Sequence, residues 1–180
     1  MSMNCVSKFF SIDETWSQPI IKGTPPTSRA CHTCTTVGDD LFVFGGTGGK
    51  NPLKDLHVLN TSSHAWTSPT IEGDGPEPRK CHSAAFHGAR ICIFGGSGKS
   101  AGKSADDEIF YNDLYWLYTT MDSRFWNKLI VKPLGPARAG HTDMSHLFPT
   151  GEFFTKEKLY VFGGYSNSQH LCNDLHALDV

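Results

Sequence analysis

The hexapeptide Leu-Phe-Val-Phe-Gly-Gly at 41–46 recurs as Ile-Cys-Ile-Phe-Gly-Gly at 91–96 and as Leu-Tyr-Val-Phe-Gly-Gly at 159–164. Each copy is a short apolar run that ends in two glycines, a pattern typical of a buried strand followed by a sharp turn. Two glycines permit positive φ and a close approach of another backbone. The recurrence predicts a protein built from repeated units of short strands.

Three further landmarks recur in a fixed order around these hexapeptides. An Arg-x-x-His element precedes each one, an Asp-Leu pair follows it, and a lone tryptophan comes after the first two pairs. The arginines Arg29, Arg79 and Arg138 mark the start of each unit, and the second unit is somewhat longer than the first. The landmarks stand at 29–32, 79–82 and 138–141, at 55–56, 113–114 and 174–175, and at Trp66 and Trp126, with a further Trp16 ahead of the array.

With these landmarks at a period of roughly 50 residues, the chain resembles the kelch-repeat family. The resemblance implies an all-β fold, a kelch β-propeller whose blades are four-stranded antiparallel sheets around an axis. Segments such as Asn112-Asp113-Leu114-Tyr115 are similar to intracellular kelch proteins of plant and cell-end-marker type. The positions expected to be structural in each repeat are Arg29, His32, Gly45, Gly46 and Trp66, then Arg79, His82, Gly95, Gly96 and Trp126, then Arg138, His141, Gly163 and Gly164.

The landmarks predict a single partial propeller over residues 1–180. Blade one is expected at 29–72, blade two at 79–132, and blade three at 138–180 with only its first three strands. Residues 9–22, which contain Trp16, are expected to form an outer strand without a blade of its own. A closed ring typically needs about four to eight blades. Three explanations stay open: a fragment of a longer protein, self-association through unpaired edge strands, or an unusually small closed form.

The charge balance argues against nucleic acid or membrane as a partner. Lys and Arg number 16 and Asp and Glu number 18, so the net charge of -2 offers no broad basic field. The stretch from Met1 to Trp16 holds no uninterrupted apolar run of a signal peptide, and no later run is long enough to span a membrane. The six cysteines are therefore expected as reduced thiols, and the sequence predicts a cytoplasmic protein, with the nucleus as the alternative.

The longest insertion in the array lies between the second diglycine and its Asp-Leu pair. The stretch from Gly96 to Asp113 is much longer than its counterparts, which run from 46 to 55 and from 164 to 174. Long loops on a rigid scaffold often carry recognition, although a merely solvated insertion is the alternative. We expect a non-catalytic scaffold that binds other proteins through Lys99, Asp107, Glu108 and Tyr111, together with Tyr165, Asn167 and His170 of the neighbouring loop.

Motifs that suggest catalysis or metal binding are incomplete. Gly98-Lys99-Ser100 lacks the earlier glycine of a phosphate-binding loop, because that position is Ile93. Cys31 and Cys34 make only half of a zinc site, and residues three apart on a strand point to opposite faces. We therefore expect no enzyme, catalytic residue, metal or cofactor. The alternative is a metal-dependent kelch enzyme or specifier-type protein whose active residues lie partly outside this chain.

The recurring arginines and histidines leave two interpretations each. Arg29, Arg79 and Arg138 either direct their guanidinium groups toward a partner's carboxylates or fix the turns between blades. Histidines in register, such as His82 and His141, are expected to be structural hydrogen-bonding groups in every blade rather than catalysts.

Overall fold

The computed structural model describes residues 8–10, 15–99, 108–120, 124–131, 135–146, 158–166 and 170–179. These ranges form β-strands and turns and contain no helix, which confirms the all-β prediction. No helix in the described ranges is therefore long and apolar enough to cross a membrane.

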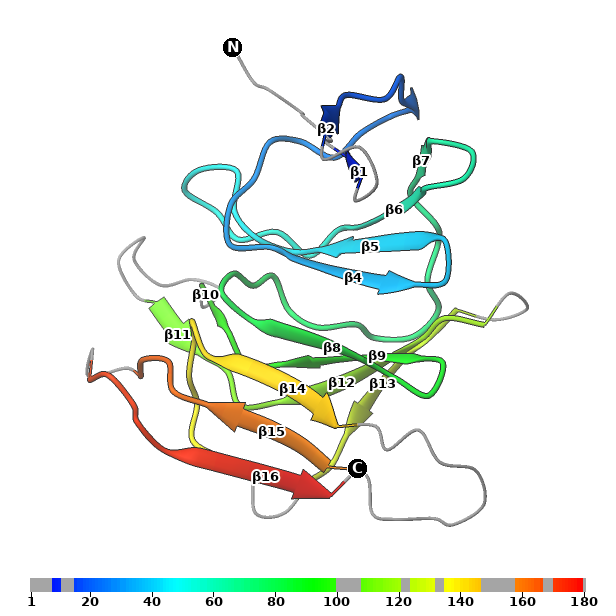
Figure 1. Cartoon of the computed structure of the whole chain (residues 1–180). Helices are drawn as coiled ribbons and strands as arrows, with labels where there is room; N and C mark the ends of the chain where they lie inside the picture. The colour runs from blue at the N-terminus through cyan, green and yellow to red at the C-terminus, as the bar shows by residue number, and fades with distance from the viewer. Residues whose placement is uncertain are drawn as a thin grey trace.

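Three sheets follow one another along the chain, from blue at one end of the stack to red at the other (Figure 1). The first sheet has the order β3-β7-β6-β5-β4, and only β3 runs parallel to its neighbour. Its strands are β3 (Lys22–Gly23), β4 (Thr33–Val37), β5 (Asp40–Phe44), β6 (Leu56–Asn60) and β7 (Ala65–Thr67).

The second and third sheets repeat this antiparallel arrangement. The second has the order β13-β12-β9-β8, and the third has the order β14-β15-β16. The strands of the second sheet are β8 (Ser83–His87), β9 (Arg90–Phe94), β12 (Leu114–Tyr118) and β13 (Trp126–Leu129). Those of the third sheet are β14 (Thr142–His146), β15 (Lys158–Phe162) and β16 (Leu175–Asp179). Among the described residues, no strand pairs with the outer edge of β16, so the propeller is partial.

Two short hairpins stand apart from these sheets. One joins β1 (Lys8–Phe10) to β2 (Thr15–Ser17), and the other joins β10 (Ser97–Lys99) to β11 (Glu108–Phe110). The first hairpin changes the expectation of one outer strand over 9–22. The tryptophan spacing predicts a strand at Trp16, and that strand is β2. The spacing does not predict the pairing of Phe9 with Trp16, because β1 carries no repeat landmark.

Apolar side chains fill the two junctions between the sheets. Strand β9 shows why the hexapeptide is apolar throughout, because its side chains alternate between the two junctions: Ile91 and Ile93 face the first sheet, and Cys92 and Phe94 face the third. A sheet that lies between two others must bury both of its faces. The first junction holds Phe42, Phe44, Leu56, Val58, Ile91, Ile93, Tyr115 and Leu117, and the second holds Ala85, Cys92, Phe94, Leu114, Trp116, Leu159 and Val161.

Substituting Leu117→Ala tests whether the first junction stabilises the fold. Leu117 is fully buried, so the change should lower the free energy of unfolding by about 2–5 kcal/mol, through lost burial and the cavity left behind. Urea denaturation followed by tryptophan fluorescence measures this loss. The matched control is Ile20→Ala, which should cost under about 0.5 kcal/mol because Ile20 is 89% exposed. Equal costs for the two changes would contradict the assignment of the core.

Candidate functional site

Each recurring arginine is held inside its own sheet. The Arg79 side chain is fully buried, and its Nη1 donates to the Gly95 carbonyl at 2.9 Å and to Asp113 Oδ1 at 2.8 Å. Its Nη2 donates to Asp113 Oδ2 at 3.2 Å, and its Nε donates to the carbonyl of Glu77 in the preceding turn at 3.1 Å. One guanidinium group therefore fixes the incoming turn, the diglycine and the aspartate.

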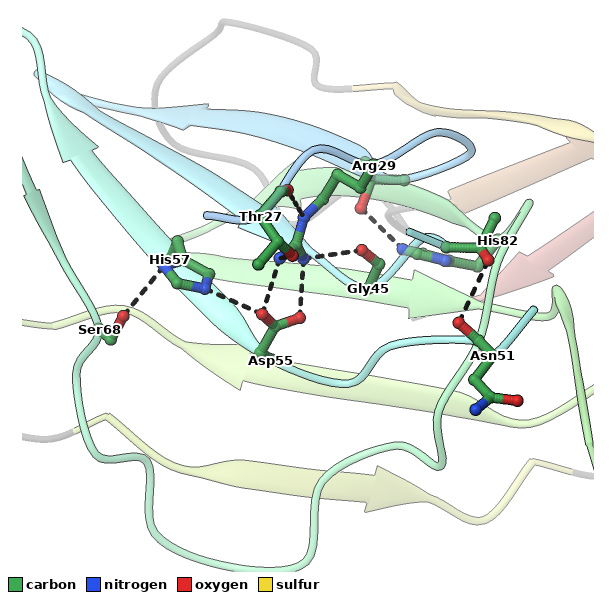
Figure 2. A network of polar contacts seen from close by, with 10 residues as sticks. Thr27, Arg29, Gly45, Asn51, Asp55, His57, Ser68 and His82 are labelled. Atoms are coloured by element: carbon green, nitrogen blue, oxygen red, sulfur yellow. Dashed lines mark hydrogen bonds and ion pairs between the residues drawn. The ribbon is translucent and has the colours of Figure 1, made fainter. Parts of the chain in front are cut away.

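The same geometry recurs at both ends of the array. Figure 2 shows Arg29 bound to both carboxylate oxygens of Asp55, each at 2.7 Å, and to the carbonyl of Gly45. Hydrogen bonding to Arg29 is the main cause that lowers the pKa of Asp55 to about 2. Arg138 binds the carbonyl of Gly163 and both oxygens of Asp174 in the same way. The interpretation that these guanidinium groups face a partner's carboxylates is wrong, because the carboxylates of their own sheets occupy them.

The second and third recurring histidines each join their sheet to the sheet before it. His82 Nε2 and Thr33 Oγ1 form a hydrogen bond of 2.8 Å, and His141 Nε2 and Ser83 Oγ form one of 2.7 Å. The two imidazole rings lie edge-on to phenylalanine rings of the preceding sheet, with ring centroids 5.3 Å apart for Phe44 and His82 and 5.2 Å apart for Phe94 and His141. These are hydrogen bonds across the junctions between sheets, as a structural role requires.

Burial keeps both histidines neutral. It lowers the pKa of His82 to about 3 and that of His141 to about 4, and the nearby charges of Arg79 and Arg138 add to the effect. His32, the first histidine of the series, is exposed, and no described residue offers it the equivalent hydroxyl group.

Backbone hydrogen bonds complete each junction, and close packing within each sheet requires the second glycine of each pair. The N–H of Gly46 donates to the carbonyl of Arg79 at 2.9 Å, and the N–H of Gly96 donates to that of Arg138 at 2.8 Å. Gly96 has a φ of 89°, and a Cβ there would approach Lys80 O and His82 Cβ to 2.8 Å. Only glycine allows this close approach of the chain at the start of the second sheet to the diglycine of the same sheet.

A basic pocket opens between the first and second sheets, beside the β10–β11 hairpin. Its volume is about 200 Å³, and three lysines from separate loops or strands line it, Lys50, Lys80 and Lys99. Lys80 Nζ lies 3.0 Å from Glu108 Oε1, an ion pair that raises the pKa of Lys80. Lys99 Nζ donates to Asn51 Oδ1 at 3.1 Å. Three cations around one carboxylate give the described lining a positive charge, in a chain whose net charge is -2.

The structure divides the expected docking residues between two junctions. Lys99 and Glu108 line the basic pocket. Tyr111 instead stacks on the Arg79 guanidinium, 4.3 Å from its ring centroid, so it supports the fold. Tyr165 lies at the junction of the second and third sheets, where its ring centroid is 5.5 Å from that of Phe110. His170 is exposed on the loop beside Tyr165, and the predicted residues Asp107 and Asn167 lie outside the described ranges.

Sequence reasoning missed two of the three lysines of the pocket. Lys80 could have been found, because it is a lysine at the repeat position that Ala30 and Ala139 occupy in the other units. Lys50 follows the first diglycine in a loop of ordinary length and gave no comparable signal. Within the described ranges, no group of three or more His, Cys, Asp or Glu side chains could hold a metal ion.

The buried histidines predict a loss of stability in mild acid. The unfolded chain binds a proton at each imidazole near pH 6.5, whereas folded His82 and His141 resist protonation until about pH 3 and 4. The unfolded state therefore binds more protons in this window, and stability that is present above pH 6.5 is lost as the pH falls. Urea denaturation should show a loss of about 2 kcal/mol for each histidine between pH 7 and pH 5.

The variant His82→Gln should remove about 2 kcal/mol of this loss, and His170→Gln, at an exposed site, should leave the pH dependence intact. The lowered pKa of Asp55 acts below pH 4 and does not interfere. Equal pH dependence in His82→Gln and the unsubstituted chain would show that His82 is not buried in its neutral form.

Comparison with known proteins identifies the family to which this architecture belongs. Residues 2–148 match the model of the KLHDC2/KLHL20/DRC7 Kelch-repeats domain. The chain is 56% identical over 45 residues to Kelch domain-containing protein 2 of Bos taurus, 42% over 55 residues to the Rab9 effector protein with kelch motifs of Danio rerio, and 47% over 58 residues to Kelch domain-containing protein 1 of Mus musculus. These stretches cover 25%, 31% and 32% of this chain and 11%, 16% and 14% of the relatives. The arginine, diglycine, aspartate and histidine network described above is thus that of a kelch-repeat domain, and the chain belongs to the kelch-repeat family.

Proposed function

We propose that the chain is a non-catalytic protein-binding scaffold whose basic pocket takes an acidic segment of a partner protein. The observation that carries this proposal is the convergence of Lys50, Lys80 and Lys99 on one pocket between two sheets. A bridge to Ser97 holds the backbone of Lys80 and pairing with Glu108 holds that of Lys99, while the ammonium groups adapt to a ligand. A pocket of about 200 Å³ is suited to one or two carboxylate side chains rather than to a whole cofactor.

The surroundings of the pocket support recognition of a polypeptide. Backbone atoms of Gly49 and Gly98 lie in the lining, next to Thr47 and Pro52, so an incoming chain meets polar and apolar groups together with the cations. The Thr47 hydroxyl donates to the carbonyl of Gly49 at 2.8 Å, which fixes the shape of this loop. Rigid loops that present a few cations favour specificity and a fast association rate.

The relatives support a protein as the partner. Among them, the Rab9 effector proteins with kelch motifs carry a name that refers to another protein, Rab9. This chain shares 42% identity with the Danio rerio member over 55 residues, so the likeness supports the class of partner and does not identify the partner of this chain.

A labelled hexaglutamate peptide tests the proposal by fluorescence anisotropy. The chain should bind it, and binding should weaken as salt is raised from about 50 to about 300 mM, because ions screen contacts between partly exposed charges. The double variant Lys50→Glu/Lys99→Glu should weaken binding by about tenfold or more. Lys22→Glu, a charge reversal on exposed β3, is the matched control and should leave binding unchanged.

A hexalysine peptide of the same length should not bind. The proposal fails if hexaglutamate does not bind, or if it binds the double variant and the unsubstituted chain equally well.

A further inference from the structure

The outward face of the third sheet exposes residues that are buried in the other two. Phe162 and Leu175 are 54% and 62% exposed, whereas their repeat equivalents Phe44 and Leu56 in the first sheet are 3% and 9% exposed. In the first and second sheets, this face packs against the sheet that follows. The third sheet thus has an interface surface that no described residue covers.

A pocket of about 710 Å³ lies at the other face of the third sheet, at its junction with the second sheet and at the position of a repeat tryptophan. At the preceding junction, the Trp126 ring centroid lies 5.3 Å from that of Phe44 and 6.5 Å from that of Tyr115. The ring also covers Gly75 so closely that a Cβ there would be 2.7 Å away. The corresponding residues Phe94 and His176 line the pocket, as does Gly135 of the following turn, and no atom lies within 4 Å of a Cβ built at Gly135. The pocket therefore has the lining of a tryptophan slot.

The backbone edge of the third sheet is also open. Gly46 and Gly96 each donate an N–H to the arginine carbonyl of the next repeat, and among the described residues Gly164 has no such acceptor. A Cβ at Gly45 would meet Arg79 O at 2.8 Å and His82 Cε1 at 3.0 Å, whereas one at Gly163 would meet only Cys172 O at 3.5 Å. The third sheet is thus shaped to receive an Arg-x-x-His element preceded by a tryptophan.

This chain itself carries such an element, an Arg-x-x-His sequence preceded by a tryptophan. Trp16 is 72% exposed and precedes Arg29 by the same interval that separates Trp66 from Arg79. Three positions after Arg29 comes His32, which is exposed and has no hydroxyl partner among the described residues. At the other end of the array, Thr142 occupies the position of Thr33 and Ser83 and is exposed.

We propose that a second copy of this chain completes the third sheet. Its Thr15–Ser17 strand pairs with β16 in place of β1, and its Trp16 enters the slot formed by Phe94, Gly135 and His176. Leu59 pairs with Trp66, and Leu117 pairs with Trp126. Leu178 is the repeat equivalent of these two leucines, so the same register places Trp16 opposite Leu178. The partner's first sheet then packs on Phe162 and Leu175 as the second sheet packs on the first.

Two such junctions close a ring. A head-to-tail interface forms a closed ring when its rotation returns to the start. Two copies with three sheets each make six sheets, which falls within the usual range of about four to eight blades. At both junctions of the pair, one copy covers the exposed apolar face of the other copy's third sheet and the unpaired edge of its β16.

Sedimentation equilibrium of the purified 180-residue chain tests the proposal. The expected species has twice the 19.8 kDa mass of one chain. Trp16→Ala should raise the dimer dissociation constant by about 30-fold or more, because a buried tryptophan is a typical hot spot of an interface. Ile20→Ala is the matched control: Ile20 is also highly exposed, but its repeat equivalent Thr70 remains exposed at a filled junction, so this dimer should persist.

Gly135→Val blocks the slot without disturbing the separate chain. A side chain at Gly135 meets no atom within 4 Å, yet it occupies the space of the incoming ring. This variant should be monomeric, with unchanged circular dichroism and unchanged hexaglutamate binding. Mixing it with Trp16→Ala should restore part of the dimer, because one intact Trp16 can then enter one intact slot.

The proposal is overturned if the unsubstituted chain is monomeric at about 100 μM, which is well above the dissociation constant of a stable dimer. The slot would then be left to another polypeptide. A dimer that forms equally well in Trp16→Ala and Gly135→Val would overturn it too. Neither result bears on the basic pocket, whose lysines lie at the junction of the first and second sheets.

Discussion

The buried guanidinium group of each repeat is the interaction on which the rest of the structure depends. A fully buried Arg79 would be strongly destabilising without partners, and two carboxylate oxygens and two carbonyls satisfy it. The side chain thereby fixes the turn, the diglycine and the aspartate of its own sheet. Its backbone acts on the preceding sheet, because Arg79 N–H donates to Leu53 O at 3.0 Å and Arg79 O accepts from Gly46. One residue type therefore both builds a sheet and joins it to its neighbour.

The three copies of this interaction differ in burial rather than in chemistry. The aspartate side chain is 17% exposed at the middle repeat and 43% and 44% exposed at the first and third. Only the middle sheet has a described sheet on both sides. The outer ion pairs lie closer to solvent and contribute less to stability, because water screens them. A junction on the outer face of the third sheet would reduce this difference.

The repeat pattern predicted the sheets because every landmark has a local cause. Diglycines, apolar runs and a recurring arginine are recognisable in the sequence. In the structure these glycines adopt positive φ. The histidine hydrogen bonds were predicted only as a class, since spacing does not reveal that His82 bonds to Thr33, 49 residues earlier in the sequence. The docking residues were harder still to predict from the sequence. Tyr111 reads as an exposed loop aromatic in the sequence, but it stacks on Arg79, and Lys80 joins the pocket only because two sheets meet there.

The central claim is that one set of contacts forms every junction, including a junction between two copies of the chain. Amide hydrogen exchange at the second glycine of each pair, measured by NMR in the concentrated protein, tests it most directly. Gly46 and Gly96 donate to arginine carbonyls within the chain and should exchange slowly. If a second copy supplies Arg29, Gly164 should exchange at a similarly slow rate. Fast exchange at Gly164 beside slow exchange at Gly46 and Gly96 would contradict the junction between copies, and fast exchange at all three would contradict the shared contacts themselves.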